Sequence, residues 1–189
     1  MKKLVTILIL FMSFFMKAQQ SDTTLLIIDI QNFYYPGGSS ELVNPDAAGK
    51  NAQKLLNYFR KQKMLVIHVR HNAKQGAEIH EDVKPLPGEK VISKDEVSCF
   101  KNTDLLEFLN NNKIKNLIIC GMQTHMCVEA ATRTGSDFGF KCTLIHNACA
   151  TKDLKFGNKI VKAEDVHYST LATLKAYAEV IDLETFMKK

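Results

Sequence analysis

The feature that most constrains the fold is the apolar segment 24–30, which reads Thr-Leu-Leu-Ile-Ile-Asp-Ile and carries its one charged residue, Asp29, near its end. Polar and apolar residues do not alternate along it. A strand with this pattern is buried on both faces, as in a parallel sheet that lies between two layers of helices. The segment therefore predicts a central strand of an α/β domain.

Strand-like and helix-like segments alternate along the rest of the chain. Further strands are expected at 64–69, 91–93, 117–120 and 142–145, and helices at 45–63, 104–109, 127–133 and 163–178. Asn44-Pro45 offers a cap and a first-turn proline for the first of these helices. This alternation indicates a three-layer α/β/α sandwich with a doubly wound, mostly parallel sheet. We place it at residues 22–186 as a single domain.

The first eighteen residues differ from the rest of the chain. Two lysines are followed by an apolar run over 4–15 and by the tripeptide Met16-Lys17-Ala18. A run of about a dozen apolar residues is shorter than the ~20 that a membrane-spanning helix needs. The pattern is typical of a secretory signal peptide with cleavage near Ala18. We therefore expect a periplasmic or secreted protein without a membrane anchor.

The charge pattern argues against a nucleic-acid partner. Loss of Lys2, Lys3 and Lys17 with the signal would lower the formal net charge from +5 to +2. No stripe of Lys and Arg with interleaved aromatic residues is present, and such a stripe is the usual footprint of nucleic-acid binding. A small molecule is the expected ligand.

Three polar residues fall where catalytic groups gather in doubly wound sheets, at the carboxyl ends of the strands. Asp29 closes the first strand, Lys94 follows the third, and Cys127 begins the helix after the fourth. A helix N-terminus and a nearby lysine would both lower the pKa of a thiol. A nucleophile, a carboxylate and a cation are the minimum for covalent acyl transfer. We expect the three to meet in one pocket, with Lys101 pointing elsewhere.

Three ordered motifs resemble those of the isochorismatase-like cysteine hydrolase superfamily, which includes the nicotinamidases. They are D-x-Q-N-x-[FY] from Asp29, K-x3-S-x-F-x2-T-x-L from Lys94, and G-x-x-T-x-x-C-V from Gly121. The resemblance implies that Asp29 is the general base, Lys94 the orienting cation and Cys127 the nucleophile. It covers almost the whole chain after the signal.

The same resemblance implies further parts of a pocket. A cis peptide bond is expected at Met122–Gln123, with the amides of Gln123 and Cys127 forming an oxyanion hole. The substrate-binding residues that we expect are Tyr34, Glu78, His80 and Phe100. The long polar stretch 70–89 would set specificity, since loops of this length are usually functional or disordered.

The metal ligands of the nicotinamidases have no full counterpart in this chain. Those enzymes use an Asp-x-His pair after the second strand, whereas this chain reads His68-Val69-Arg70-His71-Asn72. Glu78, His80 and the other two histidines could still ligate zinc. We nevertheless favour a site without metal or other cofactor, which resembles the amidase-type branch that includes streptothricin hydrolase.

These observations predict an exported hydrolase that cleaves the C–N bond of a small amide or lactam through a thioester on Cys127. Two alternatives are a nicotinamidase-type, metal-assisted amidase and a non-catalytic small-molecule binder of the same fold. A binder would need no combination of Asp29, Lys94 and Cys127. We also expect a homo-oligomer, a dimer or higher.

Overall fold

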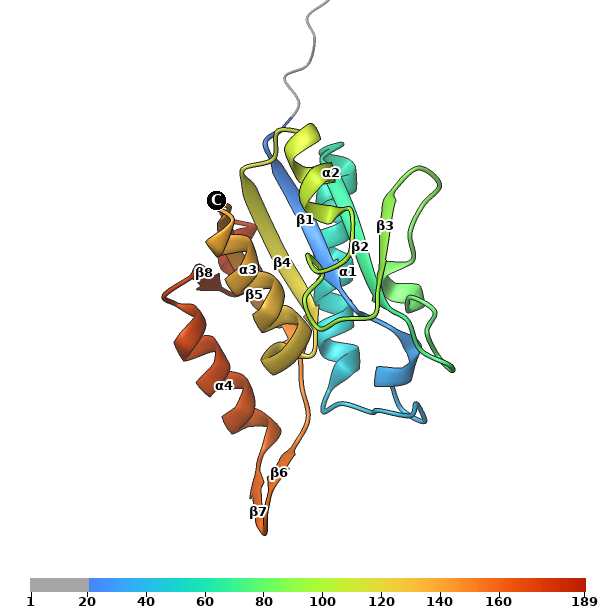
Figure 1. Ribbon diagram of the computed structural model, residues 1–189, viewed down its shortest axis with the longest axis vertical. Helices are drawn as coiled ribbons and strands as arrows, with labels where there is room; N and C mark the ends of the chain where they lie inside the picture. Colours follow the sequence, from blue (N-terminus) through green and yellow to red (C-terminus); the bar gives the residue numbers. More distant parts are fainter. Residues whose placement is uncertain (1–20) are drawn as a thin grey trace, which may run out of the picture.

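The computed structural model describes residues 21–189 and shows a three-layer α/β/α sandwich (Figure 1). The expected signal peptide lies outside the described residues. The central sheet has six strands in the order β3-β2-β1-β4-β5-β8, and all neighbours are parallel. The strands are β1 (Thr23–Ile28), β2 (Leu65–His71), β3 (Lys90–Lys94), β4 (Asn116–Met122), β5 (Lys141–Ala150) and β8 (Ala178–Ile181). The predicted fold class is thus confirmed.

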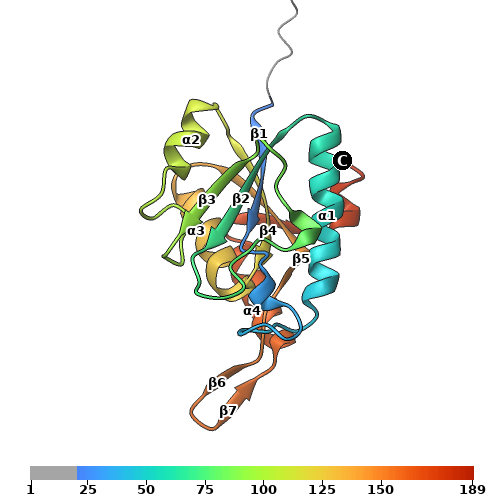
Figure 2. The same cartoon turned by 90° about the vertical axis from the view of Figure 1, so that its right-hand side faces the viewer.

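Helices cover both faces of this sheet (Figures 1 and 2). One face carries α1 (Pro45–Lys61) and the short α5 (Leu183–Phe186). The other carries α2 (Leu105–Asn111), α3 (Glu129–Asp137) and α4 (Ala163–Leu174). Within residues 21–189, no helix has the length and apolar character needed to cross a membrane.

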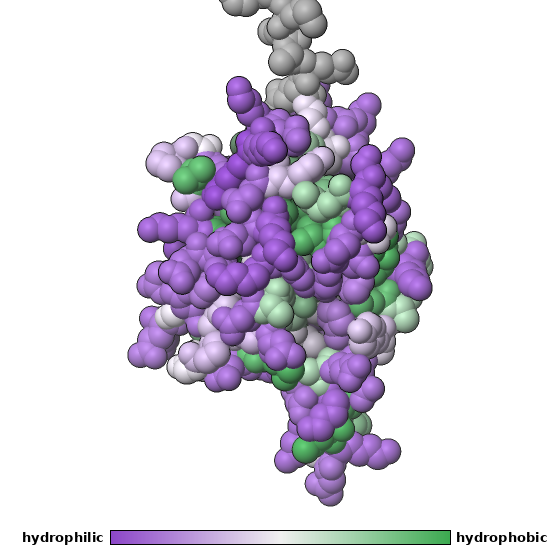
Figure 3. Space-filling view, turned by 180° about the vertical axis from the view of Figure 1, so that it is seen from behind, coloured by the Kyte–Doolittle hydropathy of each residue, from purple (hydrophilic) through white to green (hydrophobic). Residues whose placement is uncertain are grey.

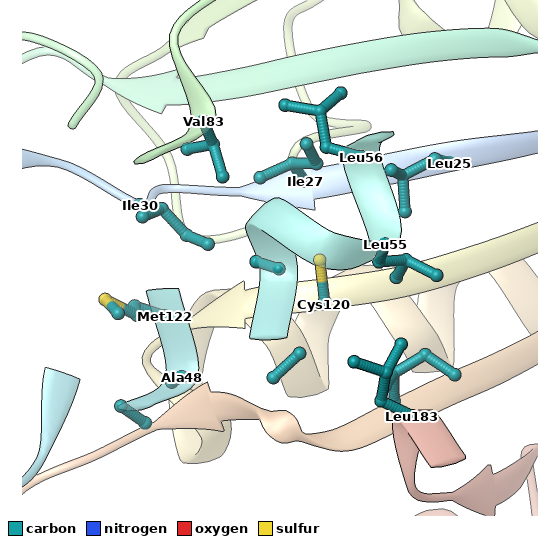
Figure 4. Close-up of a cluster of buried hydrophobic side chains, with 14 of the residues drawn as sticks. Leu25, Ile27, Ile30, Ala48, Leu55, Leu56, Val83, Cys120, Met122 and Leu183 are labelled. Carbon is teal, nitrogen blue, oxygen red and sulfur yellow. The ribbon is translucent and has the colours of Figure 1, made fainter. Parts of the chain in front are cut away.

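The continuous apolar run of β1 is explained by these two layers. Leu25 and Ile27 pack toward α1, as Figure 4 shows, while Leu26 and Ile28 pack on the opposite face. Each of the four is at most 1% exposed. Burial of one such side chain contributes about 1.5–3 kcal/mol. β1 is therefore anchored at the centre of the sheet, and the residue that follows it has a fixed position.

Several elements differ from the sequence-based expectation. β5 extends to Ala150, and the last long helix ends at Leu174 instead of Ala178, because the following residues form β8 against β5. A two-stranded antiparallel ribbon, β6 (Leu154–Phe156) and β7 (Lys159–Val161), lies between β5 and α4. Pairing with the distant β5 makes β8 a strand, and local sequence does not reveal it. The ribbon is instead a local hairpin, for which the Gly157-Asn158 turn is a signal in the sequence.

Candidate active site

Asp29, Lys94 and Cys127 meet at the carboxyl edge of the sheet. Asp29 follows β1, Lys94 is the last residue of β3, and Cys127 lies in the π-helical turn η3 (Thr124–Val128) after β4. Lys94 Nζ lies 2.7 Å from Asp29 Oδ2, and neither side chain is exposed. The same ammonium donates to Cys127 Sγ at 3.3 Å. The predicted convergence is confirmed, and Lys101 instead pairs with Glu96 at the surface.

The lysine ammonium is held by further acceptors. Lys94 Nζ donates to the carbonyl oxygen of Glu96 at 3.1 Å, and it lies 3.4 Å from Nδ1 of His71. Burial disfavours its charge, but Asp29 and Cys127 outweigh that effect and raise the pKa of Lys94 above its usual value. Position 94 therefore carries a fixed positive charge in a water-poor setting.

Burial controls the protonation of the two reactive groups. It raises the pKa of Asp29, although the Lys94 ammonium acts in the opposite direction. Burial and the Asp29 carboxylate together raise the pKa of Cys127 to about 12, against the effect of Lys94. The expected lowering of the thiol pKa is wrong for this resting state. Cys127 is 6% exposed inside η3 instead of sitting at an open helix end.

The backbone conformation at two positions brings the Asp29 carboxylate and the Cys127 thiol close together. Asp29 has φ +47°, a left-handed conformation that is uncommon for residues other than glycine. Gly121 in β4 has φ +133°, and a Cβ there would lie 1.9 Å from the carbonyl oxygen of Ile28. No other residue fits at position 121, so β4 approaches β1 through bare backbone just before η3. The peptide bond Met122–Gln123 is cis.

Tyr34 is the one expected substrate-binding residue that reaches this centre. It lies in the short 3-10 turn η1 (Asn32–Tyr34) and is 6% exposed. Its hydroxyl accepts a hydrogen bond from Gln123 Nε2 at 3.3 Å. Burial, with a further contribution from the Cys127 and Asp29 charges, raises its pKa. The oxyanion-hole role of the Gln123 and Cys127 amides stays a prediction.

The other three expected substrate-binding residues lie elsewhere. Glu78 is exposed, and only its backbone carbonyl contacts the η1 segment. The His80 ring stacks on Tyr35 with a centroid distance of 3.5 Å. Phe100 packs against two aromatic rings beyond the end of α3, Phe138 and Phe140. None of these contacts involves Asp29, Lys94 or Cys127, and the role of the three residues in substrate binding stays a prediction.

The candidate metal ligands are engaged separately. His68 Nε2 lies 2.9 Å from Glu89 Oε2, His71 faces Lys94, and His80 covers Tyr35. Across residues 21–189, no three His, Cys, Asp or Glu side chains are grouped so that they could hold a metal ion. The donor set present at this edge of the sheet therefore does not fit a nicotinamidase-type metal.

Sequence reasoning missed the role of Gln31, although it lies in the first motif. Its fully buried side chain donates from Nε2 to the carbonyl oxygens of His71 at 2.9 Å and Ala77 at 2.7 Å. Its Oε1 accepts from the His71 amide at 2.7 Å. Gln31 thus fixes the end of β2 and the loop that follows. Only the position of Gln31 between Asp29 and the η1 turn could have indicated this structural role.

Comparisons with known proteins agree with this geometry. Residues 23–185 match the family model of the isochorismatase domain. The isochorismatase family protein YddQ of Bacillus subtilis is 43% identical over 178 residues, which cover 88% of this chain and 99% of that protein. Streptothricin hydrolase of Streptomyces noursei is 31% identical over 139 residues, or 69% of this chain and 55% of that enzyme. The crystal structure of an isochorismatase from Pseudomonas putida has a TM-score of 0.83 and 33% identity, covering 87% of this chain and 89% of that one. The chain therefore belongs to the isochorismatase family and is a hydrolase of that family.

Proposed function

We propose that this hydrolase cleaves the C–N bond of a small amide or lactam through a thioester on Cys127. The observation that carries the proposal is the position of Lys94 Nζ, 2.7 Å from Asp29 Oδ2 and 3.3 Å from Cys127 Sγ. A proton acceptor, a nucleophile and a fixed cation are in direct contact where little water enters. Likeness to streptothricin hydrolase supports an amidase-type reaction over other hydrolyses.

In the first half-reaction, Asp29 accepts the thiol proton and the sulfur attacks the amide carbon. The carbonyl oxygen becomes an oxyanion, for which the amides of Gln123 and Cys127 are the proposed donors. Asp29 then gives its proton to the leaving nitrogen, the C–N bond breaks, and the acyl group stays on sulfur. The raised pKa of Asp29 suits a group that must both take and return a proton near neutral pH.

In the second half-reaction, Asp29 takes a proton from water and the resulting hydroxide attacks the thioester. The C–S bond breaks, the acid product leaves, and the sulfur regains its proton from Asp29. Lys94 keeps its charge throughout. It favours the anionic form of the sulfur at both stages and holds Asp29 in place.

Turnover of a panel of small amides and lactams by purified protein tests this proposal. Cys127→Ala should abolish turnover, while the matched control Lys101→Ala should leave it unchanged, because Lys101 is exposed and pairs with Glu96. Mass spectrometry of the rapidly quenched enzyme should show the acyl mass on the peptide that contains Cys127. Turnover by Cys127→Ala would overturn the proposal.

A chelator separates this proposal from the metal-assisted alternative. Dialysis against a strong chelator should leave amide turnover unchanged, because the histidines at this edge have other partners. Loss of turnover that zinc, iron or manganese restores would instead support a metal-assisted amidase.

We also propose that the chain is exported, on the basis of its first eighteen residues alone. Fractionation of cells of the source organism, followed by N-terminal sequencing, should find a chain that starts near Gln19 outside the cytoplasm. A cytoplasmic protein that retains its first residues would contradict export.

A further inference from the structure

The ribbon of β6 and β7, here called the arm (residues 152–162), projects away from the sheet (Figures 1 and 2). It carries large apolar side chains in solvent: Phe156 is 86% exposed and Ile160 is 62% exposed. Figure 3 shows hydrophobic surface on this projection. A two-stranded ribbon on its own is only marginally stable in water, and clustered exposed apolar residues mark interaction sites. We therefore expect the arm to be covered by a binding partner.

The strand register sorts the arm's side chains into two faces. Leu154 pairs with Val161 and Phe156 pairs with Lys159. Directly opposed residues of an antiparallel pair point to the same side, and the side alternates along each strand. One face of the arm therefore carries Leu154, Phe156 and Val161, with Lys159 beside Phe156 near the tip, and the other face carries Ile160 opposite Lys155.

A cavity of about 470 Å³ lies at the base of the arm. Its walls are the first turns of α1 and α4 and the end of β5, and they include Ala47, Ala48, Ala150 and Ala163. Alanines on every wall leave room for a bulky group, and the lining also includes polar side chains such as Asn147 and His167. This volume lies within the range of sites that bury small molecules, and one phenylalanine side chain occupies less than that.

Charges on the two surfaces are complementary. Lys155 and Lys159 of the arm make no ion pair with any residue in 21–189. Glu164, which lines the cavity, and Asp165 beside it are likewise exposed and unpaired within the described chain. An arm with apolar side chains and two unpaired lysines, and a cavity of mixed polar and apolar lining that is bordered by Glu164, thus occur on the same molecule.

The arm cannot fill the cavity of its own molecule. Thr151 and Ala163, at the two ends of the arm, are themselves part of the cavity wall, and the strands between them lead outward (Figure 2). We propose that the arm of one protomer inserts Phe156 into this cavity of a second copy, with Lys159 near the partner's Glu164. A reciprocal exchange of two arms gives a closed, two-fold dimer.

This contact would reach the nucleophile turn of the partner. Thr124 in η3 donates to the carbonyl oxygen of Ala150 at 3.2 Å, so its hydroxyl oxygen accepts from His167 Nδ1 at 2.9 Å. His125 Nδ1 lies 2.6 Å from the hydroxyl of Thr151. Ala150, Thr151 and His167 all line the cavity. An inserted arm would therefore rest on the wall that supports the turn containing Cys127.

Measurement of mass in solution tests the proposal without reference to the chemistry of Cys127. Sedimentation or light scattering should give a dimer for the unmodified protein at tens of micromolar, and a monomer for Phe156→Asp with an unchanged circular dichroism spectrum. Leu86→Asp is the matched control, because Leu86 is 52% exposed and belongs neither to the arm nor to the cavity lining. It should remain a dimer. A monomeric unmodified protein, or a dimeric Phe156→Asp, would overturn the proposal.

Two further experiments identify the surfaces that meet. Lys159→Glu and Glu164→Lys should each weaken the dimer about tenfold, and the combined variant should recover it. A mixture of Phe156→Cys protein with Ala47→Cys protein should form a disulfide between chains under mild oxidation, whereas neither variant alone should do so. A combined variant that stays monomeric, or crosslinking of Phe156→Cys with itself, would contradict insertion of the arm into the cavity.

Discussion

Two carboxylates near the ends of the same sheet, Glu89 and Asp29, are held in opposite ways. Glu89 accepts from Arg60 through both oxygens at 2.8 Å and from the Leu86 amide at 2.8 Å, and it lies 2.9 Å from His68 Nε2. Burial works against its charge, but these donors outweigh it and lower the pKa of Glu89 to about 2. Asp29 has one ammonium and one thiol as partners, and burial raises its pKa.

The contrast shows what separates a structural carboxylate from a reactive one. A carboxylate surrounded by donors is a stable anion that neither gives nor takes protons near neutral pH. A carboxylate with fewer donors and more burial stays ready to bind a proton. Deeper burial and fewer donors together distinguish Asp29 from Glu89.

The largest effect should come from Asp29→Asn. Loss of a general base lowers turnover by about 10²–10⁴-fold. The same change should speed the alkylation of Cys127 by iodoacetamide at pH 7, because the Asp29 carboxylate raises the thiol pKa. Glu89→Gln is the control and should keep kcat within about twofold. A variant that keeps near-normal turnover would remove Asp29 from its role as proton acceptor, and slower alkylation would contradict the effect of the Asp29 carboxylate on the thiol pKa.

Glu89→Gln should instead reduce stability. The folded-state pKa of about 2 lies below the value of roughly 4.3 in the unfolded chain, so the anion stabilises the fold above about pH 4.3. That contribution is lost as the pH falls toward 2. Urea unfolding should show a deficit of about 3 kcal/mol at pH 7 and roughly half of it at pH 3. An equal deficit at both pH values would contradict this account of Glu89.

Gln31→Glu places a carboxylate among acceptors, so this new carboxylate should destabilise the fold as the pH rises, whereas the Glu89 carboxylate stabilises it. Its oxygens would face the carbonyl oxygens of His71 and Ala77, which now accept from the Gln31 amide. The loss should be about 2 kcal/mol at pH 8 and smaller at pH 5, where a protonated carboxyl can again donate. Thermal unfolding at the two pH values measures it, and Gln31→Met is the control without pH dependence. A stability loss that is larger at pH 5 than at pH 8 would contradict the role of Gln31 in holding the end of β2 and the loop that follows.

The smallest effect concerns the selectivity of the thiols. All five cysteines are buried, and burial raises the pKa of each. Only Cys127 touches an ammonium among the described residues. Iodoacetamide should therefore label Cys127 a few-fold faster than the others, with a rate that keeps rising up to pH 10. Peptide mapping measures both, and a plateau near pH 7 or earlier labelling of Cys149 would be the contrary result.

The sequence was sufficient to place Asp29, Lys94 and Cys127 together, because the carboxyl ends of parallel strands share one edge and each residue follows a recognisable strand. It could not give the protonation state of Cys127, which depends on how deeply η3 is buried. Nor could it place Phe100, whose ring packs on residues about 40 positions later in the chain. β8 was missed because pairing with β5, and not local composition, makes it a strand. The arm is a local hairpin, and its Gly157-Asn158 turn could have indicated it.

Gly121 shows how the reactive spacing is controlled. The separation of the strands that carry Asp29 and η3 is set by main chain against main chain, at a point where a single methyl group would collide with Ile28. Tyr34, the expected substrate-binding residue at this centre, belongs to another segment, η1. Substitutions in η1 can therefore alter what binds beside the nucleophile while the contact between β1 and β4 keeps base and nucleophile in place. A side chain at position 121 would push β4 away from β1 and change the distance between base and nucleophile. Gly121 is therefore required for the reaction itself, whichever substrate the protein binds.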